Sequence, residues 1–155
     1  METVSRKEKA IAFFEEGYNC AQSVALAFAD ILPLDRQSLA RLASSFGGGV
    51  GRLREICGAV SGMAMVLGFL YGYSGPETGP LKAEHYALVQ KAAKDFEARN
   101  GSVVCRELLG LDKKHDDPTP APRTPSYYHN RSCASYVGSA AEILETIISN
   151  SQSPE

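Results

Sequence analysis

Apolar residues recur every three or four positions along most of this chain, which is the spacing of one face of an α-helix. In residues 5–17, Ala10, Phe14 and Tyr18 lie on one side and charged residues occupy the others. No stretch alternates apolar and polar residues long enough to indicate a strand. The pattern predicts an all-α fold, a compact bundle of about six to seven helices. The other predicted helices cover about residues 20–31, 36–45, 54–71, 81–99, 102–109 and 132–149.

Three of these helices have a predicted N-cap, and one connection is unusually long. Asn19, Asp35 and Ser102 stand at the expected cap positions of their helices. Residues 110–129 carry four prolines and little periodicity. Connections in compact domains have a median length of about 4–6 residues, so this segment is expected to be a lid, an interface arm or a disordered excursion. No linker or repeat divides the chain, which is expected to form a single domain over residues 1–155.

Charge and hydropathy exclude several classes of partner. The chain of 155 residues has 16 basic and 18 acidic residues, which are well mixed and give a formal charge of −2. This balance gives no electrostatic footprint for nucleic acid or for an anionic membrane. The N-terminal residues carry charges where a signal peptide would be apolar, and no apolar run approaches the length of a membrane span. We therefore expect a cytoplasmic protein with no nucleic-acid partner and no membrane insertion.

The four cysteines share one position within their helices. Each falls in the first turn or so of a predicted helix and begins that helix's apolar stripe. A helix N-terminus stabilises a thiolate, whereas burial destabilises it, so a metal or a partner thiol would decide the balance. Permanent disulfides are not expected in the cytoplasm. The pattern predicts one buried redox or metal site formed by Cys20, Cys57, Cys105 and Cys133.

The spacing of the cysteines leaves the chemistry of this site open. The intervals of 37, 48 and 28 positions are unlike the paired C-x-x-C blocks of zinc ribbons, ferredoxins or thioredoxin-like folds. Convergence of helix N-termini would still gather distant ligands, as in the metal sites of helix bundles. The alternative is four unrelated thiols that only pack, since free cysteine is often buried.

A glycine-rich segment precedes the second cysteine. The segment 47–51 holds four glycines, which permit positive φ angles and would expose backbone N–H groups near Cys57 to sulfur or another anion. We count Gly48, Gly49 and Gly58 among the candidate cofactor-binding residues, and Arg52 and Arg54 could add positive charge. The segment lacks the Lys-Ser/Thr of a P-loop and the βαβ context of a dinucleotide site, so no nucleotide is expected.

Small residues also mark one face of the helix that follows. The glycines at 58, 62, 68 and 72 each cost up to ~1 kcal/mol of helix propensity relative to alanine. Close packing of another helix would offset this cost, and a homodimer contact is one way to supply it. His85 and His129 are weaker candidates for a ligand or a proton carrier, and His85 is more readily explained as a core histidine.

The local sequences around the cysteines resemble the C_GCAxxG_C_C family of redox-active proteins over about residues 5–148. The resemblance rests on Asn19-Cys20-Ala21-Gln22, Phe46-Gly-Gly-Gly, Cys57-Gly-Ala-x-x-Gly62, Cys105 before Leu108-Leu109-Gly110, and Cys133 before Tyr136-Val137. It implies a small helical protein whose four cysteines are its functional signature. A similar domain accompanies haem and an iron–sulfur centre in split-Soret cytochromes, which favours a cluster. This chain has no C-x-x-C-H and should carry no covalent haem, and Ile56 stands where the family label has glycine before cysteine.

Three functional hypotheses follow from these observations. The leading one is a protein for electron transfer or redox sensing, in which the four thiolates bind an iron–sulfur cluster or, as the alternative, zinc. The second is a thiol–disulfide oxidoreductase that uses one cysteine pair and an unknown redox partner. The third is a non-enzymatic helical module that dimerises through its glycine face. The sequence leaves undecided whether the protein is an enzyme.

Overall fold

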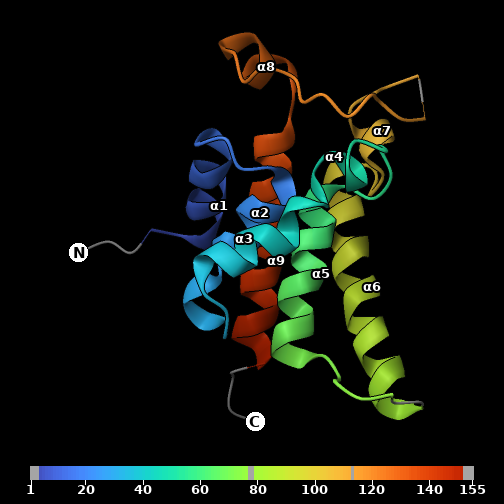
Figure 1. Cartoon of the computed structure of the whole chain (residues 1–155). Helices are drawn as coiled ribbons and strands as arrows, with labels where there is room; N and C mark the ends of the chain where they lie inside the picture. The colour runs from blue at the N-terminus through green and yellow to red at the C-terminus, as the bar shows by residue number, and fades with distance from the viewer. Residues whose placement is uncertain (1–3, 77–78, 113, 152–155) are drawn as a thin grey trace.

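The computed structural model describes residues 4–76, 79–112 and 114–151, and these residues form a helical bundle (Figure 1). The described residues contain no strand, only one isolated antiparallel bridge between Ile56 and Val104. The prediction of an all-α fold is therefore confirmed. The long helices are α1 (Arg6–Glu15), α2 (Cys20–Leu26), α3 (Arg36–Ser44), α5 (Gly58–Tyr71), α6 (Pro80–Asn100) and α9 (Cys133–Ser151). The short ones are η1 (Ala29–Ile31), α4 (Gly47–Val50), α7 (Cys105–Leu108) and α8 (Pro125–Asn130).

Helices α2 and α9 form the centre of the bundle. Helix α2 contacts α1, α3, α5 and α9, while α9 also contacts α1, α5 and α6 (Figure 1). Large apolar side chains fill the space between them. Burying each such side chain stabilises the folded state by roughly 1.5–3 kcal/mol. The most completely buried large side chains are Phe14, Phe28, Phe96, Leu39, Met63, Leu67 and Leu144.

The local signals for helix starts agree with the structure at two of the three predicted caps. The Asn19 side chain accepts from the Gln22 N–H, and the Gln22 side chain accepts from the Asn19 N–H, which completes a capping box. Asp35 caps α3 through the Ser38 N–H. The prediction for Ser102 is wrong, because α7 begins at Cys105 and the Ser102 hydroxyl accepts instead from the Val104 N–H.

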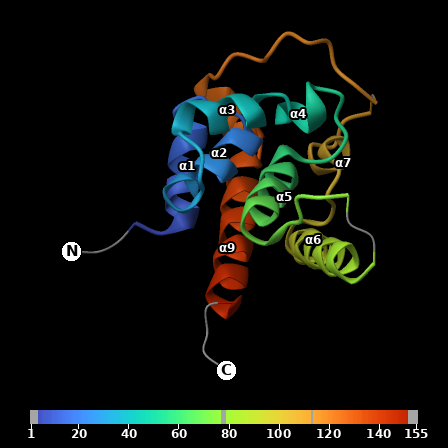
Figure 2. The ribbon, with the colours of Figure 1, turned by 60° about the horizontal axis from the view of Figure 1, so that its bottom comes forward.

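Two predicted helix boundaries need correction, and one short helix was not predicted. The helix expected from residue 54 begins at Gly58, because Arg54 has a φ of 60° and pairs its backbone with another segment. The helix expected to run to Ile31 ends at Leu26 and continues as the 3-10 turn η1. The long connection contains the short helix α8, which Thr124 caps and whose first residue is proline. Residues 114–124 of that connection run past the end of the bundle between α7 and α8 (Figure 1, Figure 2).

The glycine face of α5 packs against α2 of the same chain. A Cβ atom on Gly62 would lie 2.8 Å from the Ala21 carbonyl oxygen, and one on Gly58 would lie 3.0 Å from the Cys20 Cβ. These contacts supply the close helix packing that the small residues predicted. A Cβ on Gly68 would meet nothing within 4 Å. The homodimer stays a prediction, and Gly58 and Gly62 are not available for it because α2 covers them.

The membrane prediction can be compared with the helices themselves. Among the described residues, no helix combines the length and the apolar character that crossing a bilayer would require.

Candidate functional site

All four cysteines line one small cavity at the end of the bundle where α2, α7 and α9 begin. The cavity has a volume of about 60 Å³. Cys57, Cys105 and Cys133 are buried, and Cys20 is half-buried. The structure thus brings together residues that are far apart in sequence, and the thiols are not scattered through the core. That they form one redox or metal site stays a prediction. Cys20, Cys105 and Cys133 are each the first residue of a helix, and Cys57 is the N-cap of α5.

A short backbone pairing places the second and third cysteines. The Cys57 N–H donates to the Val103 carbonyl at 2.8 Å, and the Cys105 N–H donates to the Glu55 carbonyl at 2.6 Å. This antiparallel contact holds the approach to α5 against the approach to α7. Because each of the two segments ends in a cysteine at a helix start, their pairing brings both thiols to the same cavity.

The candidate glycines Gly48, Gly49 and Gly58 also line the cavity. At Gly49 and Gly58 a side chain would come too close to neighbouring atoms. Gly49 has a φ of 72°, and a Cβ on it would lie 2.6 Å from the Glu55 nitrogen and 2.7 Å from the Cys105 Cβ. Real Cβ atoms do not approach so closely, so only glycine fits there. Whether any of the three contacts a cofactor stays a prediction.

Cys20 and Cys133 form an interacting pair on one side of the cavity. A hydrogen bond from the Cys20 thiol is the main cause that lowers the pKa of Cys133 from 9.0 to about 7, and Arg131 and Arg123 lower it further. The same hydrogen bond and burial raise the pKa of Cys20 well above its ordinary value. The pair therefore ionises as one thiolate on Cys133 stabilised by one thiol on Cys20.

Cys57 and Cys105 behave differently on the other side. Burial is the main cause that raises the pKa of Cys57 to about 12. Burial also raises the pKa of Cys105, although Arg54 opposes the effect by donating from Nη1 to the Cys105 Sγ at 3.6 Å. A position at a helix start is thus not sufficient to ionise a thiol in this protein, because desolvation outweighs the helix dipole at both residues.

Arg54 is a buried charge at the cavity wall. Its side chain is only 3% exposed, and its Nε donates to an Asp116 carboxylate oxygen at 2.8 Å. The Nη2 atom is buried and has no hydrogen-bond partner within the described residues. The φ of Arg54 is 60°. A positive φ costs a residue with a side chain of order 1–3 kcal/mol, and backbone strain of this kind is concentrated at functional sites. The sequence indicated that Arg54 could add charge here, but not that Asp116 would pair with it.

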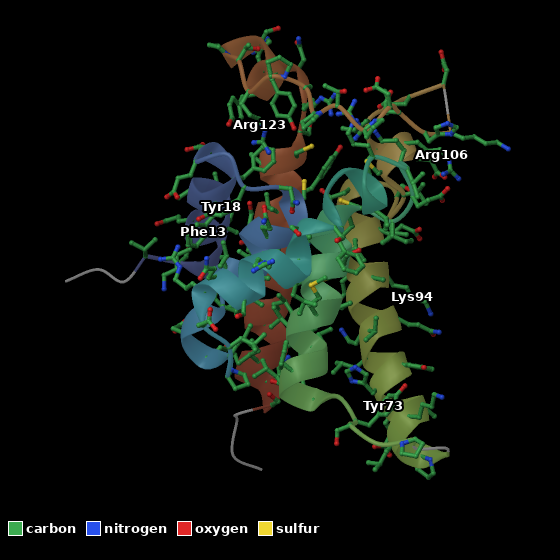
Figure 3. The ribbon with its side chains drawn as sticks, in the orientation of Figure 1. Phe13, Tyr18, Tyr73, Lys94, Arg106 and Arg123 are labelled. Atoms are coloured by element: carbon green, nitrogen blue, oxygen red, sulfur yellow. The ribbon has the colours of Figure 1, made fainter. Side chains whose placement is uncertain are left out.

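Sequence reasoning missed the arginines and aromatic residues that close the cavity. Arg123 donates to the carbonyl oxygens of Phe14 and Tyr18, each at 3.0 Å, and its guanidinium lies 4.4 Å from the Phe14 ring centroid. Figure 3 shows Arg123 at the end of the bundle, beyond Tyr18, with Lys94 farther down on α6 and Tyr73 lower still, in the segment before that helix. Two residues of the long connection, Arg123 and Tyr127, therefore line the cavity beside the cysteines, and the role of this connection as a lid stays a prediction. For Arg131, the only feature of the sequence that could have indicated a place at this site was its position two residues before Cys133.

The same wall includes Arg131 and Tyr127. The Arg131 guanidinium lies 4.8 Å from the Tyr127 ring centroid, and both residues line the cavity. His85 and His129 are not among the lining residues, and the His85 Nδ1 is buried without a hydrogen-bond partner in the described part of the chain. Neither histidine is therefore placed next to the thiols.

The four thiols suit a soft metal or an iron–sulfur cluster in chemical kind. Their placement is less suited, since no group of three or more cysteine, histidine or acidic side chains in residues 4–76, 79–112 and 114–151 is arranged to hold a metal ion. The iron–sulfur cluster and zinc stay predictions, and the buried unpaired Arg54 Nη2 is a further feature that four metal ligands alone would not explain.

Comparison with known proteins assigns the chain to one family. Residues 18–147 match the model of the family described as "Putative redox-active protein (C_GCAxxG_C_C)". The match covers most of the chain and includes all four cysteines, and the protein belongs to this family. It is accordingly a redox-active, cysteine-containing, all-helical protein. No curated protein and no solved structure matches it.

Proposed function

We propose that this protein is a thiol–disulfide oxidoreductase in which Cys133 is the attacking thiol and Cys20 is the resolving thiol. The observation that carries the proposal is the placement of both thiols in one cavity, where Cys20 is the main cause that lowers the pKa of Cys133 to about 7. The thiolate is the nucleophile in exchange, and the best attacking thiol has a pKa near the ambient pH. Of the four thiols, Cys133 alone meets this condition.

The reaction takes place in two exchange steps. The Cys133 thiolate attacks one sulfur of a substrate disulfide, the substrate S–S bond breaks, and one substrate thiolate leaves. Cys20 then loses its proton to that thiolate and attacks the Cys133 sulfur, which releases the second substrate thiolate. The substrate gains two electrons and one proton, which comes from Cys20, and the second substrate thiolate takes its proton from solvent. The protein retains a Cys20–Cys133 disulfide. A dithiol partner protein is required to reduce this disulfide and complete the cycle.

The test is to alkylate the protein across a glutathione redox series and identify the modified peptides by mass spectrometry. We expect one disulfide, between Cys20 and Cys133, to form at a defined potential. Cys20→Ser and Cys133→Ser should each abolish it, whereas the matched variants Cys57→Ser and Cys105→Ser should leave it intact. If all four thiols stay alkylatable at every potential, or if another pair forms the bond, the proposal is wrong.

A second candidate is a cluster or metal bound by all four thiols for electron transfer or redox sensing. The shared cavity favours it, because one cavity lined by four cysteines could bring four sulfur ligands to one group. Anaerobic purification followed by iron and acid-labile sulfide analysis tests this candidate. Each of the four Cys→Ser changes should then abolish the chromophore. A colourless, metal-free protein that retains full activity in cells would exclude it. The two candidates differ in requiring four cysteines or two.

A further inference from the structure

The cysteine cavity has three cationic residues in its wall and no anionic one. Arg54, Arg123 and Arg131 line it together with the thiols, and among the residues that the structure describes no aspartate, glutamate, lysine or histidine lines it. Thiols alone do not require this concentration of positive charge. Guanidinium groups are the side chains that recognise compact oxyanions most effectively, because their N–H groups form a rigid fork.

The charges of these arginines are only partly balanced. Asp116 pairs with Arg54, and a Cys133 thiolate would balance one further charge. No ion pair joins Arg123 or Arg131 to a carboxylate in the part of the chain that the structure describes. Arg123 contacts neutral carbonyls and aromatic rings, and Arg131 lies over Tyr127. Even with Cys133 ionised, the cavity therefore keeps an excess of positive charge.

One donor in the wall is unused. The Arg54 Nη2 is buried and unpartnered, while the Nε and Nη1 of the same group contact Asp116 and Cys105. An unsatisfied buried donor costs about 1–3 kcal/mol, or more when it is charged, and therefore needs an explanation. An acceptor atom in the cavity that Arg54 lines would satisfy it.

The volume limits the size of such an acceptor. One water needs roughly 10–15 Å³ of cavity volume. A cavity of about 60 Å³ therefore holds only a few water-sized positions. This suits an ion of four or five heavy atoms.

We propose that the cavity binds a small inorganic oxyanion of the size of sulfate or phosphate, held by Arg54, Arg123 and Arg131 beside the Cys133 thiol. This inference does not depend on disulfide formation, because binding requires only the reduced protein. Where exchange does occur at Cys133, the same groups would select substrates that carry a compact negative group next to the reacting sulfur.

The experiment measures protection of Cys133 in the reduced full chain. Cys133 is alkylated with iodoacetamide at pH 7 while sodium sulfate replaces sodium chloride at constant ionic strength, and the modified peptide is followed by mass spectrometry. We expect alkylation to be about tenfold slower when sulfate is at ten times its Kd, because only the free fraction reacts. An equal rate in chloride and sulfate would overturn the proposal.

Variants separate site binding from a general effect of salt. Arg131→Gln should weaken protection so that about tenfold more sulfate is needed, the factor that corresponds to about 1.4 kcal/mol. Arg123→Gln provides a second, independent variant. Arg99→Gln is the matched control, since Arg99 lies on α6, pairs with Glu142 and does not line the cavity. The ratio of rates with and without sulfate is compared within each variant, because these arginines also affect Cys133 directly.

The outcomes distinguish the two proposals. Loss of protection in both Arg131→Gln and Arg123→Gln, with protection kept in Arg99→Gln, supports oxyanion binding even if no disulfide forms in the glutathione series. An equal shift in all three variants would contradict oxyanion binding and leave the exchange proposal to its own test.

Discussion

The two sides of the cysteine cavity start from the same local arrangement and reach opposite chemical states. Each side contributes two cysteines at or next to a helix start, and three of the four side chains are buried. On one side, a partner thiol and three nearby arginines lower the pKa of Cys133 to about 7. On the other side, desolvation raises the pKa of Cys57 to about 12. The difference shows that the balance between desolvation and the hydrogen-bonding or charged neighbours, rather than the position at a helix terminus, decides which thiol ionises here.

The largest expected effect is on the side of Cys57 and Cys105, where Arg54 is buried. Arg54→Met should destabilise the fold by about 3–5 kcal/mol, because it leaves the Asp116 carboxylate without its main ion-pair partner in a buried setting. Urea unfolding measures the loss. Arg52→Met is the matched control: Arg52 is 3.7 Å from the same carboxylate but is 20% exposed, so about 1 kcal/mol or less is expected. Equal losses would contradict the importance of the buried pair.

The next effect is on reactivity and compares the two sides directly. At pH 7 about half of Cys133 is thiolate, whereas Cys57 is almost entirely protonated. Even after the lower intrinsic reactivity of a weakly basic thiolate is included, alkylation of Cys133 should be on the order of a hundredfold faster. Iodoacetamide labelling with peptide mass spectrometry measures both rates. Comparable rates at the two cysteines would remove the proposed asymmetry.

A smaller effect concerns the backbone that supports Cys105. Gly49→Ala should cost about 2 kcal/mol more than Gly51→Ala, because added methyl groups in a packed site typically cost about 1–3 kcal/mol. Both glycines have a positive φ, of 72° and 56°, so the conformational penalty is shared. Only the Cβ at position 49 meets other atoms, while one at position 51 meets nothing within 4 Å. Thermal unfolding compares the variants, and equal losses would show that the space around Gly49 can relax.

The smallest expected effect is a dependence of stability on pH. The pKa of Cys133 is lowered in the folded protein from 9.0 to about 7. Its contribution to stability is therefore complete above about pH 9 and is lost as the pH falls through 7. The raised pKa of Cys57 acts in the opposite sense, since its contribution is lost as the pH rises above 9. Wild type should gain on the order of 1 kcal/mol between pH 7 and 9.

Cys133→Ser tests this pH dependence, because it should remove the gain between pH 7 and 9. Cys57→Ser should keep the gain and show a smaller loss of stability above pH 9. Urea midpoints across this range measure both. A gain that persists in Cys133→Ser would assign the effect to another group.

The predictions from the sequence were correct where the interactions are local, and they failed where the interactions join segments far apart in the chain. Asn19 and Asp35 were predictable as caps because a cap bonds to N–H groups only three residues away. The start of α5 was not predictable from periodicity, because the apolar pattern continues through Ile56 while the backbone of residues 54–57 pairs with residues 103–106. A pairing between segments this far apart has no local signal. Helix α8 was missed because its first residue, Pro125, was interpreted as part of a loop.

The sequence alone determined the class of fold and the positions of the four cysteines at or beside helix starts. These depend on periodicity, capping and propensity, which act over a few residues. Only the tertiary structure decided which thiols meet and which one ionises. Those outcomes depend on Arg54, Asp116, Arg123 and Arg131, whose charges approach the cavity from remote parts of the chain. Electrostatic and desolvation effects follow distance in space, and the order of residues does not encode that distance locally.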